Sequence, residues 1–154
     1  MKGYKKSMEI LIDTNVILDA LLKRSPFAED AYTILKMADE KKIHANIAAF
    51  AITDIYYFIS KSLDHDNRLK AIKALFNILN VVSVTKKDIE KAMSFSEFND
   101  LEDALQLQSL KKIKGNYIVT RDEEFQKITD KAISPKDFIQ KTLQDESETV
   151  ITKC

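Results

Sequence analysis

Cysteine, histidine, glycine and proline are all scarce in this chain of 154 residues. Its single cysteine, Cys154, excludes an internal disulfide and a multi-thiolate zinc site. Only His44 and His65 could add imidazole ligands, so a zinc centre built on nitrogen and sulfur is not expected. Any bound metal would therefore be held by oxygen ligands, which suit Mg2+ and Mn2+.

The chain also lacks an excess of charge and a long apolar run. Lys and Arg total 24, and Asp and Glu total 24, so no overall attraction to nucleic acid is expected. No apolar stretch approaches the roughly 20 residues that cross a bilayer. The segment at residues 8–16 is broken by Glu9 and Asp13 and has no small-residue cleavage site, unlike a signal peptide. We therefore expect a cytoplasmic protein without membrane contact.

Only two glycines and two prolines interrupt the chain, which predicts helices joined by short loops. Short apolar or β-branched runs predict strands at residues 8–12, 43–48, 81–84, 117–120 and around 132–133. Apolar residues at helical spacing predict helices at residues 27–42, 49–63, 67–80, 86–98, 101–114 and 122–128, and from 135 onward. This alternation predicts an α/β fold of three layers, α/β/α, around a mostly parallel sheet of four or five strands.

One domain is expected over residues 8–143, because no repeat or linker divides the chain. Gly115 lies where a C-cap glycine would end the preceding helix. The flanking segments, residues 1–7 and 144–154, are expected to be disordered or to be extensions of the domain.

Acidic residues directly follow two of the predicted strands. Asp13 comes after the first strand, and Asp122 comes after the strand at residues 117–120. Ligand sites on open parallel sheets lie beyond the carboxyl ends of the strands, so we expect these two carboxylates in one site. Asp is also a preferred N-cap residue, and a capping role for each stays open beside the functional one.

Asp54 lies in a predicted helix whose other side chains are almost all apolar. A carboxylate in a buried helix is costly to desolvate unless it is paired, protonated or bound to a metal. A salt bridge, for example to Lys61, is one interpretation. A metal ligand that faces a cleft is the favoured one.

Three acids open the helix at residues 101–114: Asp100, Glu102 and Asp103. Asp100 is placed as an N-cap, and acids in a first turn suit the helix dipole, which favours a structural role. Asp100 and Asp103 nevertheless share a helix face, which directs both toward the end of the sheet. Converging carboxylates repel one another unless a divalent cation binds among them. Such ions position water and stabilise charge on phosphate, so the pattern suggests phosphodiester hydrolysis.

The acids belong to an ordered set of motifs that resembles the PIN domain family. The motifs are Ile-Leu-Ile-Asp13-Thr14-Asn15-Val-Ile-Leu-Asp19, then Asp103-Ala104, then Val119-Thr120-Arg121-Asp122 followed by Phe125. Their order and spacing match over residues 8–138, and single-domain VapC-type toxin ribonucleases resemble the chain most. One departure is Asp54, where the family commonly has the longer Glu, so metal geometry or affinity is expected to differ.

The resemblance implies a three-layer α/β/α fold, Mg2+- or Mn2+-dependent endoribonuclease activity and frequent homodimers. The implied catalytic and metal-binding residues are Asp13, Asp54, Asp103 and Asp122. Asp100 is an additional candidate ligand, and Asn15 and Thr120 would support the acids through hydrogen bonds. A small antitoxin protein is a further partner suggested by analogy.

Binding of RNA would also need local cationic groups, because the net charge is zero. Arg121 and Arg24 are preferred, since both are expected near the cleft. Tyr56 and Tyr57 could stack on bases, although packing in the core beside Phe58 is favoured.

Three other classes of protein fit the sequence less well. A phosphatase of the haloacid-dehalogenase type needs a second Asp two residues after the first, where this chain has Asn15. A P-loop or dinucleotide-binding domain needs a glycine-rich turn that neither glycine supplies. The main alternative is a PIN-like module that binds RNA or protein with weak catalysis or none.

Overall fold

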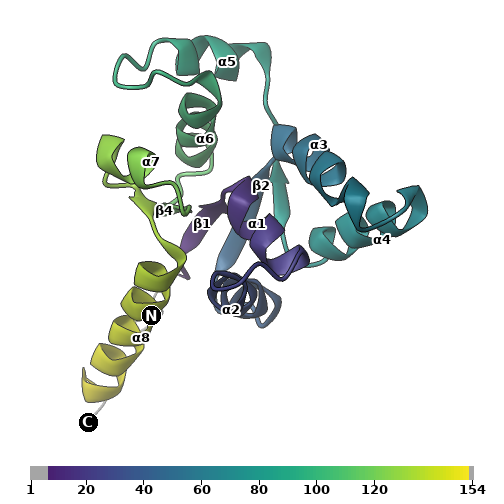
Figure 1. Ribbon diagram of the computed structural model, residues 1–154. Coiled ribbons are helices and arrows are strands. Elements are labelled where there is room, and N and C mark those ends of the chain that lie inside the picture. Colours follow the sequence, from purple (N-terminus) through teal and green to yellow (C-terminus); the bar gives the residue numbers. More distant parts are fainter. Residues whose placement is uncertain (1–6, 153–154) are drawn as a thin grey trace.

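The computed structural model describes residues 7–152, without the side chains of residues 149–152. At its centre lies a five-stranded parallel sheet with the strand order β3-β2-β1-β4-β5 (Figure 1). The strands are β1 (Glu9–Ile12), β2 (His44–Ala48), β3 (Asn80–Val82), β4 (Tyr117–Val119) and β5 (Ala132–Ile133). The predicted mostly parallel sheet of four or five strands is confirmed.

Helices connect the strands and cover both faces of the sheet. They are α1 (Thr14–Leu21), α2 (Ala28–Asp39), α3 (Ala49–Phe58), the 3-10 helix η1 (Ile59–Lys61), α4 (His65–Phe76), α5 (Lys86–Met93), α6 (Leu101–Lys112), α7 (Glu123–Ile128) and α8 (Pro135–Thr152). On one face α6 packs against β1 and β4, while α2 and α3 contact β2 on the other (Figure 1). The predicted three-layer α/β/α fold is confirmed.

The alternation of side chains along β1 separates two hydrophobic cores. Ile10 and Ile12 belong to the core shared with α1, α2 and α3, whereas Leu11 belongs to the core shared with α6. All three are fully buried, and each such side chain stabilises the fold by about 1.5–3 kcal/mol. Burial on both faces explains why these three residues form a continuous apolar run in the sequence.

The helix predicted at residues 49–63 is shorter and less buried than expected. The α-helix ends at Phe58, and η1 continues the chain. Ile55 and Ile59 are buried, but Tyr57 and Phe58 are 72% and 53% exposed. The expectation of a buried helix, with Tyr57 in the core beside Phe58, is therefore wrong. An almost uniformly apolar run does not reveal which face of its helix packs inward.

Two residues after the ends of α1, α2 and α6 lies a lysine whose backbone is left-handed: φ is 52° at Lys23, 60° at Lys41 and 53° at Lys114. Glycine is the residue usually found at this position. Gly115 follows one residue later, where a Cβ atom would lie 2.4 Å from Leu110 Cδ1. The prediction that Gly115 provides the left-handed cap is wrong, because Lys114 does so and Gly115 permits close packing on Leu110.

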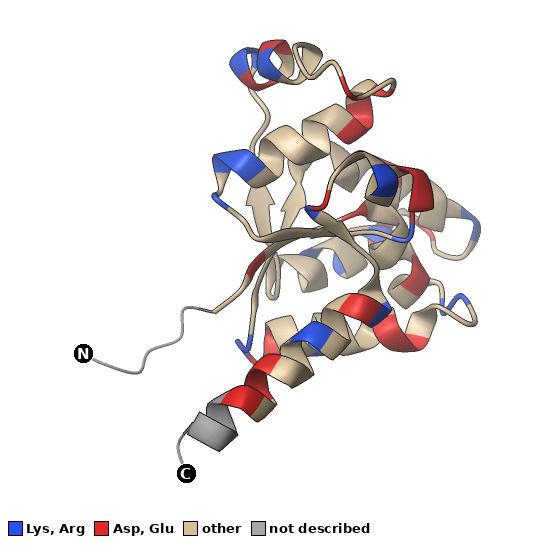
Figure 2. Cartoon of the chain, turned by 90° about the vertical axis from the view of Figure 1, so that its left-hand side faces the viewer, with Lys and Arg blue, Asp and Glu red and all other residues tan. Residues whose placement is uncertain are grey.

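The last helix, α8, begins at Pro135 as predicted and projects past the body of the domain (Figure 1; Figure 2). Residues 144–152, expected to be disordered or to be an extension of the domain, continue this helix. Residues 1–6 and 153–154 of the two expected flanking segments lie outside the described residues. No helix in the described part of the chain is long and apolar enough to span a membrane.

Candidate active site

The carboxyl ends of β1 and β4 lie side by side because the two strands pair in register. Ile12 pairs with Val119, which makes the next residues, Asp13 and Thr120, neighbours. The backbone N–H of Asp13 donates to the Val119 carbonyl at 2.9 Å, and Thr120 Oγ1 donates to Asp13 Oδ2 at 2.7 Å. The backbone N–H of Asp122 donates to Thr120 Oγ1 at 3.1 Å. Strand pairing thus places the two strand-end acids on one edge of the sheet.

A cleft of about 520 Å³, which we call the acid cleft, lies at this edge. The carboxylates in its wall are Asp13, Asp54, Asp100, Glu102, Asp103 and Asp122. They come from the end of β1, from α3, from the start of α6 and from the end of β4. The structure therefore brings together the four predicted catalytic acids and the additional candidate Asp100. It adds Glu102, which the sequence analysis placed in the same helical turn but not in the site.

Three acids of the cleft also cap helices, so the capping role that the sequence left open for each is confirmed. Asp13 caps α1, Asp100 caps α6 and Asp122 caps α7. In each case the Oδ1 atom accepts the capping backbone N–H bonds. The cap holds the carboxylate in one orientation and leaves its second oxygen for another donor or a cation.

Asp13 is held by side chains from three parts of the chain. Besides Thr120, Asn15 Nδ2 donates to Asp13 Oδ2, and Gln106 Nε2 donates to Asp13 Oδ1, both at 3.3 Å. Gln106 is 1% exposed, and its Oε1 atom has no partner among the described residues. The sequence analysis missed Gln106. The available signal was its place three residues after Asp103, on the same helix face.

Burial and mutual repulsion raise the pKa values of three acids. Burial raises the pKa of Asp13, although hydrogen bonds, above all that from Thr120, oppose the rise. Burial is also the largest cause for Asp103, whose pKa rises from 3.8 to about 6 with further contributions from neighbouring carboxylates. The pKa of Glu102 is raised by burial and then by the charge of Asp54. The raised pKa values indicate that the negative charges of these carboxylates are not balanced by nearby cationic groups.

The donor set of the acid cleft fits a divalent cation that prefers oxygen ligands. Carboxylates that raise one another's pKa are stabilised when a cation binds between them. Residues whose side chains are described include no group of three acids, histidines or cysteines already close enough to hold an ion. The acids therefore line the cleft without forming a preorganised metal-binding site. Asp54 has no ion pair to a described side chain, so the salt bridge to Lys61 is not seen.

The two arginines predicted to bind RNA meet at one buried acid, Asp19, which is 1% exposed. Arg121 donates to Asp19 through Nε and through Nη2, the latter at 3.0 Å, and Arg24 Nη1 lies 3.7 Å from Asp19 Oδ1. The guanidinium carbon of Arg121 also lies 3.9 Å from the ring centroid of Phe27. Arg121 consequently lines a groove beside Phe27, whereas Arg24 lines the acid cleft. The sequence analysis gave Asp19 no role, although a charge within an apolar helix was a signal.

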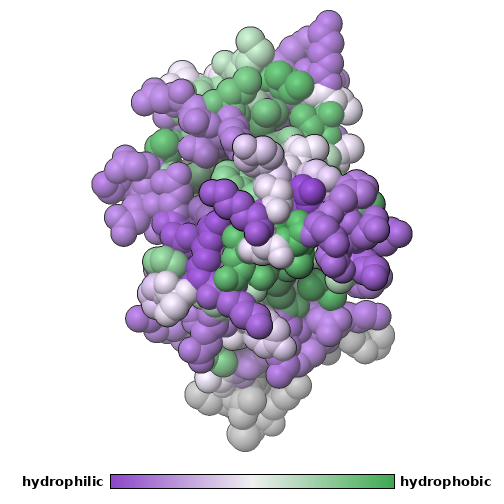
Figure 3. Space-filling view, turned by 45° about the vertical axis from the view of Figure 1, so that its right-hand side comes forward, coloured by the Kyte–Doolittle hydropathy of each residue, from purple (hydrophilic) through white to green (hydrophobic). Residues whose placement is uncertain are grey.

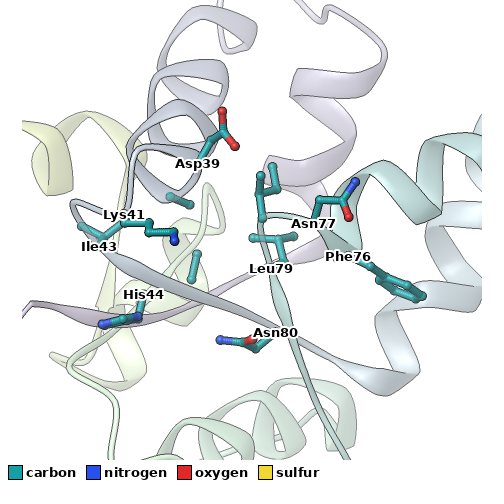
Figure 4. A pocket seen from close by; sticks show the side chains of 11 residues that line it. Asp39, Lys41, Ile43, His44, Phe76, Asn77, Leu79 and Asn80 are labelled. Carbon is teal, nitrogen blue, oxygen red and sulfur yellow. The ribbon is translucent and has the colours of Figure 1, made fainter.

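A separate pocket of about 330 Å³ lies at the opposite edge of the sheet, at the amino-terminal ends of β2 and β3 (Figure 4). Figure 4 shows Lys41, His44 and Asn80 around it, with Asp39 as its only lining acid. Ligands of open parallel sheets bind at the carboxyl edge instead. The acid cleft is therefore the candidate active site.

The fold and the cleft together define a doubly covered parallel α/β domain with acidic residues at the carboxyl ends of its strands. The sequence profile described as PIN domain matches residues 9–124. The chain belongs to the PIN domain family, and the resemblance inferred from the motifs is confirmed.

Individual relatives are consistent with this membership. Ribonuclease VapC1 of Aquifex aeolicus is 28% identical over 139 residues, which cover 88% of this chain and 96% of that protein. The structure of VapBC2 from Rickettsia felis, bound to a DNA fragment from its promoter, matches with a TM-score of 0.64 at 16% identity. The match covers 82% of this chain and 98% of the chain in that structure. Mycobacterium tuberculosis VapC20, titled a toxin that cleaves the sarcin-ricin loop, gives 0.59 at 15% identity and covers 75% and 92%.

Proposed function

We propose that this protein is an endoribonuclease that uses Mg2+ or Mn2+ to hydrolyse RNA phosphodiester bonds in the acid cleft. The observation that carries the proposal is the convergence of six carboxylates from four segments on one cleft. The relative in Aquifex aeolicus, which is named a ribonuclease and matches nearly the whole chain, supports the same activity.

Each part of the cleft has a defined role in this proposal. A bound divalent cation would supply charge stabilisation at the phosphate and make water more acidic. The residues that would hold it are Asp13, Asp54, Asp103 and Asp122, with Asp100 and Glu102 as further donors. Asn15, Thr120 and Gln106 keep the Asp13 carboxylate oriented through their hydrogen bonds. Arg24 would contact a substrate phosphate, while the ion pair of Arg121 with Asp19 supports the wall behind it.

We also propose that the protein acts as the toxin of a toxin–antitoxin pair and forms a homodimer. Similar folds occur in structures titled as a toxin–antitoxin complex from Klebsiella pneumoniae and as VapBC2 from Rickettsia felis. These likenesses support an antitoxin partner only through the shared fold. The size of the complex formed after co-expression with a neighbouring small gene, measured by light scattering, would test both points.

The activity is tested by comparing wild type with Asp13→Asn and Asp122→Asn on single-stranded and structured RNA. We expect wild type to cleave in Mn2+ and to stop in EDTA. Each substitution should lower the rate at least about 100-fold, as is common when one charge-stabilising group is removed. Asp39→Asn, an exposed acid at the opposite edge of the sheet, is the matched control and should leave the rate unchanged.

Cleavage that survives both substitutions and EDTA would refute the proposal. A wild type that binds RNA or a protein partner but never cleaves would instead favour the non-catalytic binding module.

A further inference from the structure

Two exposed aromatic rings stand at the end of α3, at the wall of the acid cleft. Phe58 lines the cleft together with Asp54, which precedes it by one helical turn. Phe58 and its neighbour Tyr57 are 53% and 72% exposed. Their ring centroids lie 5.9 Å apart with the ring planes at 80°. The rings thus present apolar surface beside the carboxylates without being needed to fill the core.

The acid cleft itself offers an RNA backbone little electrostatic attraction. Arg24 is the basic residue among its lining side chains, against six acids, and it lies 3.7 Å from the Asp19 carboxylate. Basic and acidic residues are interspersed over the face seen in Figure 2, with acids prominent along α8. Because one cationic side chain lines the cleft, ion pairs between side chains and phosphate can supply only part of the affinity for a substrate. Stacking of bases on aromatic rings is a source of affinity that needs no cationic surface.

We propose that the Phe58 ring, with Tyr57 beside it, stacks on an unpaired nucleobase next to the scissile phosphate. This inference rests on the proposed ribonuclease function. Asp54 and Phe58 are about 5–6 Å apart along one helix face, so a nucleotide whose phosphate lies among the acids can place its base on the ring. A base within an RNA duplex is stacked on its neighbours and cannot reach the ring.

The competing occupant is an apolar side chain of a protein partner. Figure 3, which turns the side of α3 and α4 toward the viewer, shows hydrophobic areas interrupted by hydrophilic residues. A base needs only one flat ring beside a site for its phosphate, and Phe58 shares its cleft with Arg24 and the acids. The observations therefore favour the base.

The test measures binding and cleavage separately with one short single-stranded RNA of known cut site. Binding is followed by fluorescence anisotropy in EDTA, where no metal-dependent cleavage occurs, and cleavage is followed in Mn2+. We expect Phe58→Ala to weaken binding and to raise KM on the order of tenfold, with kcat less affected. Phe58→Trp should restore both values. Tyr32→Ala is the matched control, since Tyr32 is 64% exposed on α2 and does not line the cleft.

A second arm removes the base instead of the ring. An abasic nucleotide beside the cut site should weaken binding to wild type by a similar factor, but should cause no further loss in Phe58→Ala. Phe58→Leu, which keeps an apolar side chain at this position, should behave like the alanine variant if stacking is the cause.

The outcomes separate this inference from the proposed function. If wild type cleaves and Phe58→Ala binds and cleaves equally well, the stacking role is overturned while the ribonuclease stands. If wild type never cleaves but Phe58→Ala loses binding to the normal RNA and not to the abasic one, stacking is supported and the catalytic proposal fails. If RNA binding is unchanged and the variant instead loses a dimer or a protein partner, the rings belong to a protein interface and the inference is wrong.

Discussion

Burial, followed by the charges of neighbouring acids, raises the pKa of Asp103 from 3.8 to about 6. Its carboxylate follows the α6 N-cap Asp100 by three residues, and the charges of Asp100 and Asp122 add to the effect of burial. Asp13, by contrast, accepts hydrogen bonds that favour its charged form, above all that from Thr120. Asp54 is half-buried at the cleft wall, so the cost of a fully buried charge does not apply to it. The acids thus share one cleft but differ in how each is stabilised.

Asp103→Asn is expected to stabilise the metal-free protein at neutral pH. Folding raises the Asp103 pKa from 3.8 to about 6, so the protonated form is favoured in the folded state. The resulting contribution to stability is fully present below pH 4 and is lost as the pH rises through about 6. Since water screens this partly exposed group, we expect the variant to unfold roughly 2–4 °C above wild type at pH 7.5.

The measurement is thermal unfolding in EDTA at pH 4.5 and pH 7.5, and the gain of the variant should shrink at the lower pH. Equal melting temperatures of the two proteins at pH 7.5 would contradict the prediction. Asp39→Asn, which changes an exposed acid outside the cleft, shows the effect of losing one charge alone.

Helices are held in place by local caps and by a few contacts between elements. Thr85 and Asp88 form a capping box at the start of α5. Asp88 also accepts a bond of 2.8 Å from Lys112 Nζ at the end of α6, and this bond holds the pKa of Asp88 well below its usual range. The pair fixes α5 against α6, the helix that carries Asp103 and Gln106 into the cleft.

The left-handed lysines at three helix ends are expected to be local weak points. Lys41→Gly should increase the free energy of unfolding by about 0.5–1 kcal/mol, because glycine adopts φ near 60° without the side-chain clash that a lysine incurs. The gain is limited by the larger entropy that glycine loses on folding. Urea unfolding checks it, with Lys42→Gly as the control, since this neighbour is also exposed but has no positive φ; the control additionally loses the surface ion pair of Lys42 with Glu40. A loss of stability in Lys41→Gly as large as in the control would show that the backbone there is not strained.

The molecule as a whole couples its stability to the occupancy of the acid cleft. Five parallel strands hold segments that are up to about 110 residues apart in the chain against one another, and the cleft lies where these segments end. An ion bound by acids of several segments would bind the folded chain and not the unfolded one. Metal binding must then raise the free energy of unfolding.

Mn2+ is expected to raise the melting temperature of wild type. At a concentration 100 times its Kd, an ion stabilises the folded state by about 2.7 kcal/mol. The rise should be smaller at pH 5.5 than at pH 7.5, because a proton on Asp103, with its pKa of about 6, competes with the ion. Thermal unfolding with and without Mn2+ measures the shift. An equal rise in the Asp13→Asn/Asp122→Asn double variant would place the ion outside the acid cleft.

Most elements of the fold and most acids of the cleft could be predicted because their signals are local. The three residues before Asp13 are all apolar, as expected for a strand buried on both faces, and a carboxylate follows them directly. The motif around Asp122 repeats this arrangement at β4. A strand, a helix cap or an acid at a strand end is defined by residues that are neighbours in the sequence. The sequence alone therefore predicted which edge of the sheet carries the site.

Contacts between distant segments decided the remainder. Gln106 reaches Asp13 across 93 positions of the chain, and Asp19 accepts bonds from Arg121 across 102 positions. The exposure of Phe58 followed from which face of α3 met the core, which its almost uniformly apolar sequence does not encode. Local sequence patterns predict the helices, the strands and the chemical groups of the site. Burial and charge pairing depend on residues that are distant in the sequence, and only the folded chain brings those residues into contact.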